Sequence, residues 1–177
     1  MQDKRNVVDR FKGKSEAEIV AVLDKNSIDL EIAIENLERD FNMGTIVRSA
    51  NAFGVRRVHV IGRRQWNKRG AMATDKYLHV EYHQSVEDFR EAMVQSDKAI
   101  VAVDNVEGST SLAKANLSRN AVLLFGAEGP GLTPAALKAA KEIVAIEQFG
   151  STRSINVGVA AGIVMYAWLQ QNILPIR

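Results

Sequence analysis

Hydrophobic positions follow two periods along the chain, and segments of the two kinds alternate. Apolar runs that are continuous or alternate with polar residues predict strands. These runs lie at residues 30–34, 55–61, 80–83, 99–103, 122–125 and 143–146. Apolar residues at helical spacing predict helices at about residues 18–25, 45–53, 86–96, 134–141 and 156–172. Residues 104–120 show neither period, and we expect loop or irregular structure there.

The regular alternation of strands and helices predicts the fold class. It is typical of an α/β protein with a mostly parallel sheet and helices on both faces. Local signals support the helix boundaries: Ser15 and Glu18 form a capping-box pattern, and Gly54 stands where a helix C-terminal glycine belongs. Pro134 suits the first turn of the helix that it opens.

Composition narrows the class of protein. A chain of 177 residues, 46% hydrophobic and 25% charged, fits one globular domain with a sizeable core. It contains no cysteine, so disulfides and thiolate metal sites are excluded. Neither a signal peptide nor a membrane span is predicted, and we expect a cytoplasmic protein without a membrane partner. His59, His79 and His83 lack the sequence spacing of a metal site, so we predict no metal.

Positive charge is concentrated in two places, although the net charge is only +2. One cluster lies within residues 4–14. The other consists of Arg63, Arg64, Lys68 and Arg69 and contains no acidic residue. Each cluster alone is most simply a solvated surface, yet local charge density is what a phosphate backbone responds to.

Two glycine-rich stretches, residues 123–132 and 150–158, follow predicted strands and lead into predicted helices. Parallel sheets place their ligand-binding loops at such positions. The spacing matches neither a phosphate loop nor a dinucleotide fingerprint, and no nucleophile elbow is present. Glu128 in the first stretch suits either structure or substrate binding. Ser154 and Asn156 in the second are, by default, helix caps.

A third polar stretch lies at residues 42–54, before and within a predicted helix. Asn42 alone would be a helix cap, and Arg48 alone would be a surface cation. Because Ile46, Val47 and Ala50 make this helix mostly buried, an anionic partner for Arg48, such as phosphate, is favoured.

In this order, the three stretches resemble the three motifs of the SpoU branch of the SPOUT RNA methyltransferases. The matching positions are Asn42, Gly44, Arg48, Ala50 and Gly54; Gly126, Glu128, Gly131 and Leu132; and Gly150, Ser154, Asn156 and Val157. The resemblance extends from about residue 30 to the C-terminus, and the preceding short helix is similar to the N-terminal part of TrmH-type enzymes. We therefore expect a basic N-terminal extension with a short helix, residues 1–28, and a methyltransferase domain, residues 29–177.

The resemblance implies a function and a site. The family transfers a methyl group from S-adenosylmethionine to a ribose 2'-hydroxyl, has a C-terminal trefoil knot and forms homodimers through the knot region and the last helix. Carried over, the cofactor contacts are Val103 (or Asp104 beside it), Phe125, Gly126, Gly131, Ile146 and Ile155. The catalytic set is Arg48, which binds phosphate or assists the hydroxyl, with Asn42, Glu128, Ser154 and Asn156 as orienting groups.

One departure from the family lies at residues 146–149. The third motif commonly opens with Ile-Pro-Met, whereas this chain has Ile-Glu-Gln-Phe, so Glu147 brings a charge near the expected pocket rim. The pocket tolerates this change if its contacts there come from main-chain atoms. A retained fold that binds RNA without catalysis therefore stays an alternative function.

The same resemblance gives the second basic cluster a substrate. Arg63, Arg64, Lys68 and Arg69 would follow RNA phosphates, with Trp66 either stacking on a base or packing in the protein. About 28 residues precede the first strand, fewer than the extra domain of many rRNA-directed relatives. We therefore favour tRNA, with rRNA as the alternative substrate.

Overall fold

The computed structural model describes residues 3–37, 42–127 and 129–174, and a seven-stranded sheet forms its centre. Its strands are β1 (Glu31–Asn36), β2 (Arg57–Gly62), β3 (His79–His83), β4 (Ala99–Val103), β5 (Thr110–Ser111), β6 (Ala121–Phe125) and β7 (Glu142–Ala145). The order across the sheet is β3-β2-β1-β6-β4-β7-β5. Every pairing between these strands is parallel, which confirms the predicted sheet.

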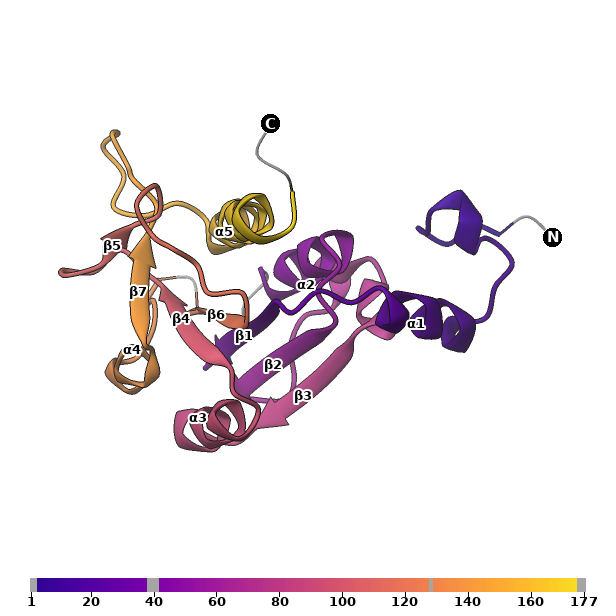
Figure 1. Cartoon of the computed structure of the whole chain (residues 1–177), viewed down its shortest axis with the longest axis horizontal. Helices are drawn as coiled ribbons and strands as arrows, with labels where there is room; N and C mark the ends of the chain where they lie inside the picture. Colours follow the sequence, from indigo (N-terminus) through magenta and orange to yellow (C-terminus); the bar gives the residue numbers. More distant parts are fainter. Residues whose placement is uncertain (1–2, 38–41, 128, 175–177) are drawn as a thin grey trace.

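Helices cover both faces of the sheet, as predicted (Figure 1). They are α1 (Glu16–Lys25), α2 (Met43–Ala52), α3 (Val86–Gln95), α4 (Pro134–Ala139) and α5 (Val157–Asn172), with short 3-10 helices at Asp9–Phe11, Arg69–Ala71 and Thr74–Tyr77. The α2 and α5 helices pack on one face, and α3 and α4 pack on the other. In the described part of the chain, no helix combines the length and apolar character needed to cross a membrane.

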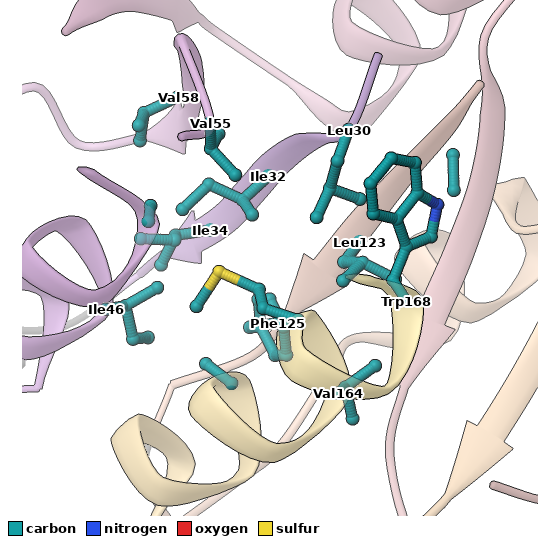
Figure 2. Close-up of a cluster of buried hydrophobic side chains, with 14 of the residues drawn as sticks. Leu30, Ile32, Ile34, Ile46, Val55, Val58, Leu123, Phe125, Val164 and Trp168 are labelled. Atoms are coloured by element: carbon teal, nitrogen blue, oxygen red, sulfur yellow. The ribbon is translucent and has the colours of Figure 1, made fainter. Parts of the chain in front are cut away.

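The period-two pattern of β1 explains why both faces are covered. Ile32 and Ile34 point to the α2 and α5 side, whereas Ala33 between them belongs to the α3 and α4 side. In the larger core, Phe125 and Trp168 lie between the sheet and α5 (Figure 2). The indole nitrogen of Trp168 donates to the carbonyl of Ser118 at 2.8 Å, so this buried polar atom is satisfied.

The stretch of residues 104–120, expected to be irregular, contains a two-residue strand. In β5, Thr110 pairs with Val144 and Ser111 pairs with Ala145 of β7. Two residues are too few to show a period in the sequence. This strand is stabilised by pairing with its neighbour rather than by a pattern of its own.

The N-terminal extension packs against the rest of the chain. The predicted capping box of α1 is present, since Ser15 and Glu18 exchange side-chain and main-chain hydrogen bonds. Phe11 and Ile19 form a small core with Tyr77, which lies in the segment between β2 and β3. Asp24 of α1 adds an ion pair with the buried Arg56 at 2.8 Å.

Candidate functional site

A pocket of about 260 Å³ lies at the carboxyl ends of β4, β6 and β7, where the sequence places the glycine-rich loops. Because the strands are parallel, the loops that follow them meet at one edge of the sheet. Five of the six predicted cofactor contacts line this pocket: Val103, Gly126, Gly131, Ile146 and Ile155. The sixth, Phe125, has its side chain fully buried in the core, because its position in β6 faces α5.

Gly126 and Gly131 fold the first glycine-rich loop tightly on itself. A Cβ atom on Gly126 would lie 2.3 Å from the carbonyl carbon of Gly131, closer than real side chains approach. Gly131 also has a φ of +72°, a left-handed conformation that favours glycine. The loop therefore requires glycine at both positions, and it presents main-chain atoms to the pocket.

Acidic side chains from the two strands on either side of β6 hold this loop in place. Asp104, which also lines the pocket, accepts a hydrogen bond from the Leu132 amide at 2.9 Å. Glu35, only 2% exposed at the end of β1, accepts from the Thr133 amide at 2.9 Å and from its hydroxyl at 2.6 Å. Sequence reasoning offered Asp104 only as a neighbour of Val103 and missed Glu35. A carboxylate at the end of a buried strand was the signal available.

A side-chain contact joins the first and third motifs. Asn156 donates from Nδ2 to Oδ1 of Asn42 at 2.9 Å, while its own Oδ1 accepts from the amides of Gly158 and Val159 at 2.9 and 3.2 Å. Asn156 is therefore the cap of α5, and Ser154 lies in the pocket wall. Asn42 makes no side-chain capping bond to α2 within the described residues. Its position links α2 to the pocket.

Two further close approaches position the start of α2. A Cβ atom on Gly44 would lie 2.6 Å from the Ala71 amide nitrogen. The main chain of α2 is therefore in direct contact with the main chain of the segment after the basic loop. A Cβ atom on Gly158 would lie 3.1 Å from Cγ2 of Thr45, so α2 also meets the start of α5. The N-terminus of α2 is therefore held between the segment after the basic loop and the start of α5.

Arg48 is exposed on α2 and lines a second pocket, of about 550 Å³, rather than the first. This pocket lies between the N-terminal extension, which includes α1, and helix α2. Arg10 and Arg56 also line it. Arg56 is 6% exposed, and within the described residues its Nη2 atom has no hydrogen-bond partner. Arg10 and Arg48 are exposed at this pocket and could meet an anion, whereas the charge of Arg56 is already balanced by its ion pair with Asp24.

The predicted RNA-binding side chains Arg63, Arg64, Lys68 and Arg69 are all exposed, on the loop after β2. Lys68 forms an ion pair with Asp75 at 2.8 Å and lies 5.4 Å from the ring of Trp66. Trp66 is partly buried against the larger core, which favours its packing role. The loop is anchored from β1, where Asn36 donates to the carbonyl of Gln65 at 3.2 Å.

Glu147, the departure from the family motif, does not line the pocket. Its carboxylate accepts hydrogen bonds from the Ser111 hydroxyl and from the Ala113 amide, and the Ser111 bond lowers the pKa of Glu147. Gln148 lines the pocket instead, and within the described residues its buried Oε1 has no partner. The charge is therefore directed away from the pocket. Glu128, the remaining predicted catalytic residue, lies outside the described residues.

The model of the SpoU rRNA methylase family matches residues 29–166, and the chain belongs to this family. The tRNA (guanosine(18)-2'-O)-methyltransferase of Escherichia coli K12 is 26% identical over 159 residues, which cover 88% of this chain and 69% of the relative. The predicted membership of the SpoU branch is confirmed.

Solved structures give the same fold. The Aquifex aeolicus TrmH/SpoU tRNA modifying enzyme has a TM-score of 0.77 and 24% identity, over 88% of this chain and 81% of that one. An AdoMet-bound rRNA methyltransferase from Sinorhizobium meliloti has a TM-score of 0.73 and 24% identity, over 82% of this chain and 57% of that one.

Proposed function

We propose that this protein transfers a methyl group from S-adenosylmethionine to a ribose 2'-hydroxyl of tRNA. The observation that carries the proposal is the joining of the three motifs at one edge of the sheet. Residues of the second and third motifs line the 260 Å³ pocket, and Asn42 of the first motif contacts Asn156 of the third. The curated tRNA 2'-O-methyltransferase relatives support tRNA as the substrate.

The pocket residues fit S-adenosylmethionine. The close approach of Gly126 and Gly131 leaves main-chain groups exposed to a ligand, which suits the polar edges of an adenosine group. The unpartnered Oε1 of Gln148 offers an acceptor for a ligand N–H or O–H group. When bound, the cofactor supplies an electrophilic methyl group on its sulfonium. The protein then has to bind the cofactor and align the nucleophile with it.

We assign Arg48 to the substrate. A guanidinium is a poor base because arginine stays protonated in proteins, so it is better suited to holding a phosphate and stabilising developing alkoxide charge. Its pocket also contains the exposed Arg10, which supports phosphate as the partner. Asn42, Ser154 and Asn156, together with Glu128, would orient the ribose.

A homodimer is part of the proposal. Val159, Ile163 and Tyr166 form an apolar row on α5, with exposed fractions of 55%, 41% and 48%. A second copy packed on this row would cover it, and would bring another Arg48 towards a cofactor pocket that its own chain does not reach. A monomer by light scattering at micromolar concentration, under conditions where methylation proceeds, would contradict this part.

The trefoil knot implied by the family resemblance also stays a proposal. It is supported by the contact between the segments after β4 and β7, where Asn105 Nδ2 donates to the carbonyl of Arg153 at 3.3 Å. The division at residue 28, the cytoplasmic location and the RNA-binding role of residues 63–69 are likewise part of the proposal.

A methylation assay tests the proposed function. The purified protein is incubated with S-adenosylmethionine and either bulk tRNA or rRNA, and the digested nucleosides are analysed by mass spectrometry. We expect 2'-O-methylnucleosides from tRNA. Methylation of rRNA alone would establish the alternative substrate. Failure to bind S-adenosylmethionine in calorimetry would favour the non-catalytic RNA-binding alternative and would contradict the proposal.

A further inference from the structure

His59, Glu81 and His83 come together on the sheet face that α3 covers, away from the pocket described above. His59 lies in β2, and Glu81 and His83 lie in the edge strand β3. Their ligand atoms all lie within 4.8 Å of one another. The spacing of the histidines in the sequence predicted no metal site, because the members of this cluster meet through strand register, in which His59 pairs with Glu81.

The distances between these atoms suit a tetrahedral metal ion. His59 Nδ1 lies 3.0 Å from His83 Nε2 and 3.7 Å from Glu81 Oε2. With metal–ligand bonds of about 2.0–2.1 Å, two ligands of a tetrahedral zinc ion lie about 3.3–3.4 Å apart. The two observed separations bracket this value, so small side-chain movements would complete the geometry.

The tautomer of His59 is fixed by a second carboxylate. His59 is 1% exposed, and its Nε2 lies 2.8 Å from Oε2 of Glu31. Glu31 also forms an ion pair with Lys98, whose Nζ lies 2.9 Å from its Oε1. In the tautomer in which Nε2–H donates a hydrogen bond to Glu31, Nδ1 carries a lone pair that faces the other two ligands. Zinc-bound histidines commonly have this carboxylate support.

The other two proposed ligands are held close to His59. His83 is partly buried in β3, and its ring centroid lies 5.2 Å from that of His59. Glu81 accepts a hydrogen bond from Arg57 through Oε1, so its Oε2 stays directed towards His59. Phe89 of α3 closes one side, with its ring centroid 5.6 Å from that of His59.

We propose that His59, Glu81 and His83 bind one Zn²⁺ ion, with Glu31 as the outer-shell partner of His59. Two imidazoles and one carboxylate are ligands that zinc prefers, whereas Mg²⁺ prefers oxygen ligands alone. Such an ion would join the edge strand β3 to β2 and stabilise the strand pair that carries the basic loop. The site is independent of the proposed methyl transfer.

Calorimetric titration with ZnCl₂ tests the site, using protein without a polyhistidine tag that has been treated with chelator and dialysed. We expect one Zn²⁺ per chain. At a free Zn²⁺ concentration about 100-fold above Kd, the midpoint of thermal unfolding should rise by about 5–10 °C. MgCl₂ at the same concentration should give no comparable rise.

Two variants distinguish this site from adventitious binding. His83→Gln should lose the stoichiometric binding and the thermal shift. His79→Gln should keep both, because His79 lies on the same strand but contacts Asp24 instead. If His83→Gln does not fold, Glu81→Gln provides the same test. Absence of binding in the wild type, or equal binding by His83→Gln or Glu81→Gln, would overturn the proposal.

Discussion

The two candidate binding regions of the sheet differ in what they present to a ligand. Around β6, β4 and β7, the pocket depends on main-chain proximity, as between Gly126 and Gly131. Around β2 and β3, the surface depends on long charged side chains such as Arg63 and Arg64, which extend into solvent. A single added methyl group should impair ligand binding in the first region, because it would overpack the main chain. In the second region, each positive charge should contribute separately to the affinity for RNA, in proportion to the number of charges.

Arg48 lines a separate pocket beside the N-terminal extension, and its removal should give the largest effect. We expect Arg48→Ala to lower kcat about 10²- to 10³-fold, as loss of one group that stabilises developing negative charge does. The Kd for S-adenosylmethionine should change less than about threefold, because Arg48 does not line that pocket. Single-turnover kinetics and calorimetry measure the two quantities.

The control for loss of charge is Arg90→Ala, which removes an exposed arginine on α3. Equal losses of catalysis and cofactor binding would contradict this division of roles.

Gly126→Ala should be the most damaging single change in the pocket region. Its Cβ would meet the main chain of Gly131 at 2.3 Å, and overpacking of this kind costs about 1–3 kcal/mol. We expect the calorimetric Kd for S-adenosylmethionine to rise by up to about 100-fold. Gly150→Ala is the matched control, since nothing lies within 4 Å of its added Cβ, and it should change Kd less than about threefold. Similar Kd values for the two variants would show that the steric account is wrong.

Asn156→Ala tests the contact between the motifs. Loss of the α5 cap should lower the free energy of unfolding by about 1–2 kcal/mol in a denaturant titration. Asn42→Ala, which keeps the cap but loses the contact with Asn156, should cost about 1 kcal/mol or less. An Asn42→Ala variant that is destabilised more than Asn156→Ala would reverse this ranking.

The smallest effect is expected from single charges of the basic loop. Arg63→Gln should weaken tRNA binding a few-fold and reduce the slope of log K against log salt concentration by about 0.7–0.9. Lys68→Gln should have less effect, because Lys68 is already paired with Asp75. Fluorescence anisotropy at several salt concentrations measures both. A slope that neither substitution changes would place the RNA elsewhere on the protein.

Most of the fold could be predicted because its strands and helices are long enough to show a period. The prediction is weakest where stability comes from a distant partner. Thr110 and Ser111 form a strand only because they pair with β7. The role of Glu35 follows from its hydrogen bond with Thr133, which lies far along the chain. No local pattern contains such information, because the pairing depends on the completed sheet.

The candidate site shows the same limit. Five of the residues predicted to contact the cofactor line one pocket, yet the family motifs do not distinguish Phe125, whose side chain faces the core, from Gly126 beside it. The motifs also assign Arg48 and the cofactor pocket to one function. They do not show that, within one chain, Arg48 lines a different pocket. Side-chain direction and chain association are properties of the packed structure, which a motif does not record.

The main-chain contact between Gly44 and the segment after the basic loop has an evolutionary consequence. A Cβ on Gly70 would lie 3.0 Å from the Thr45 amide nitrogen, so both sides of this contact are restricted to very small residues. Lengthening of the loop near Gly70 would displace the helix that carries Arg48. With residues 63–69 as the proposed RNA-binding loop, new RNA preferences are expected to arise by exchange of side chains there, while the length of the loop stays constant.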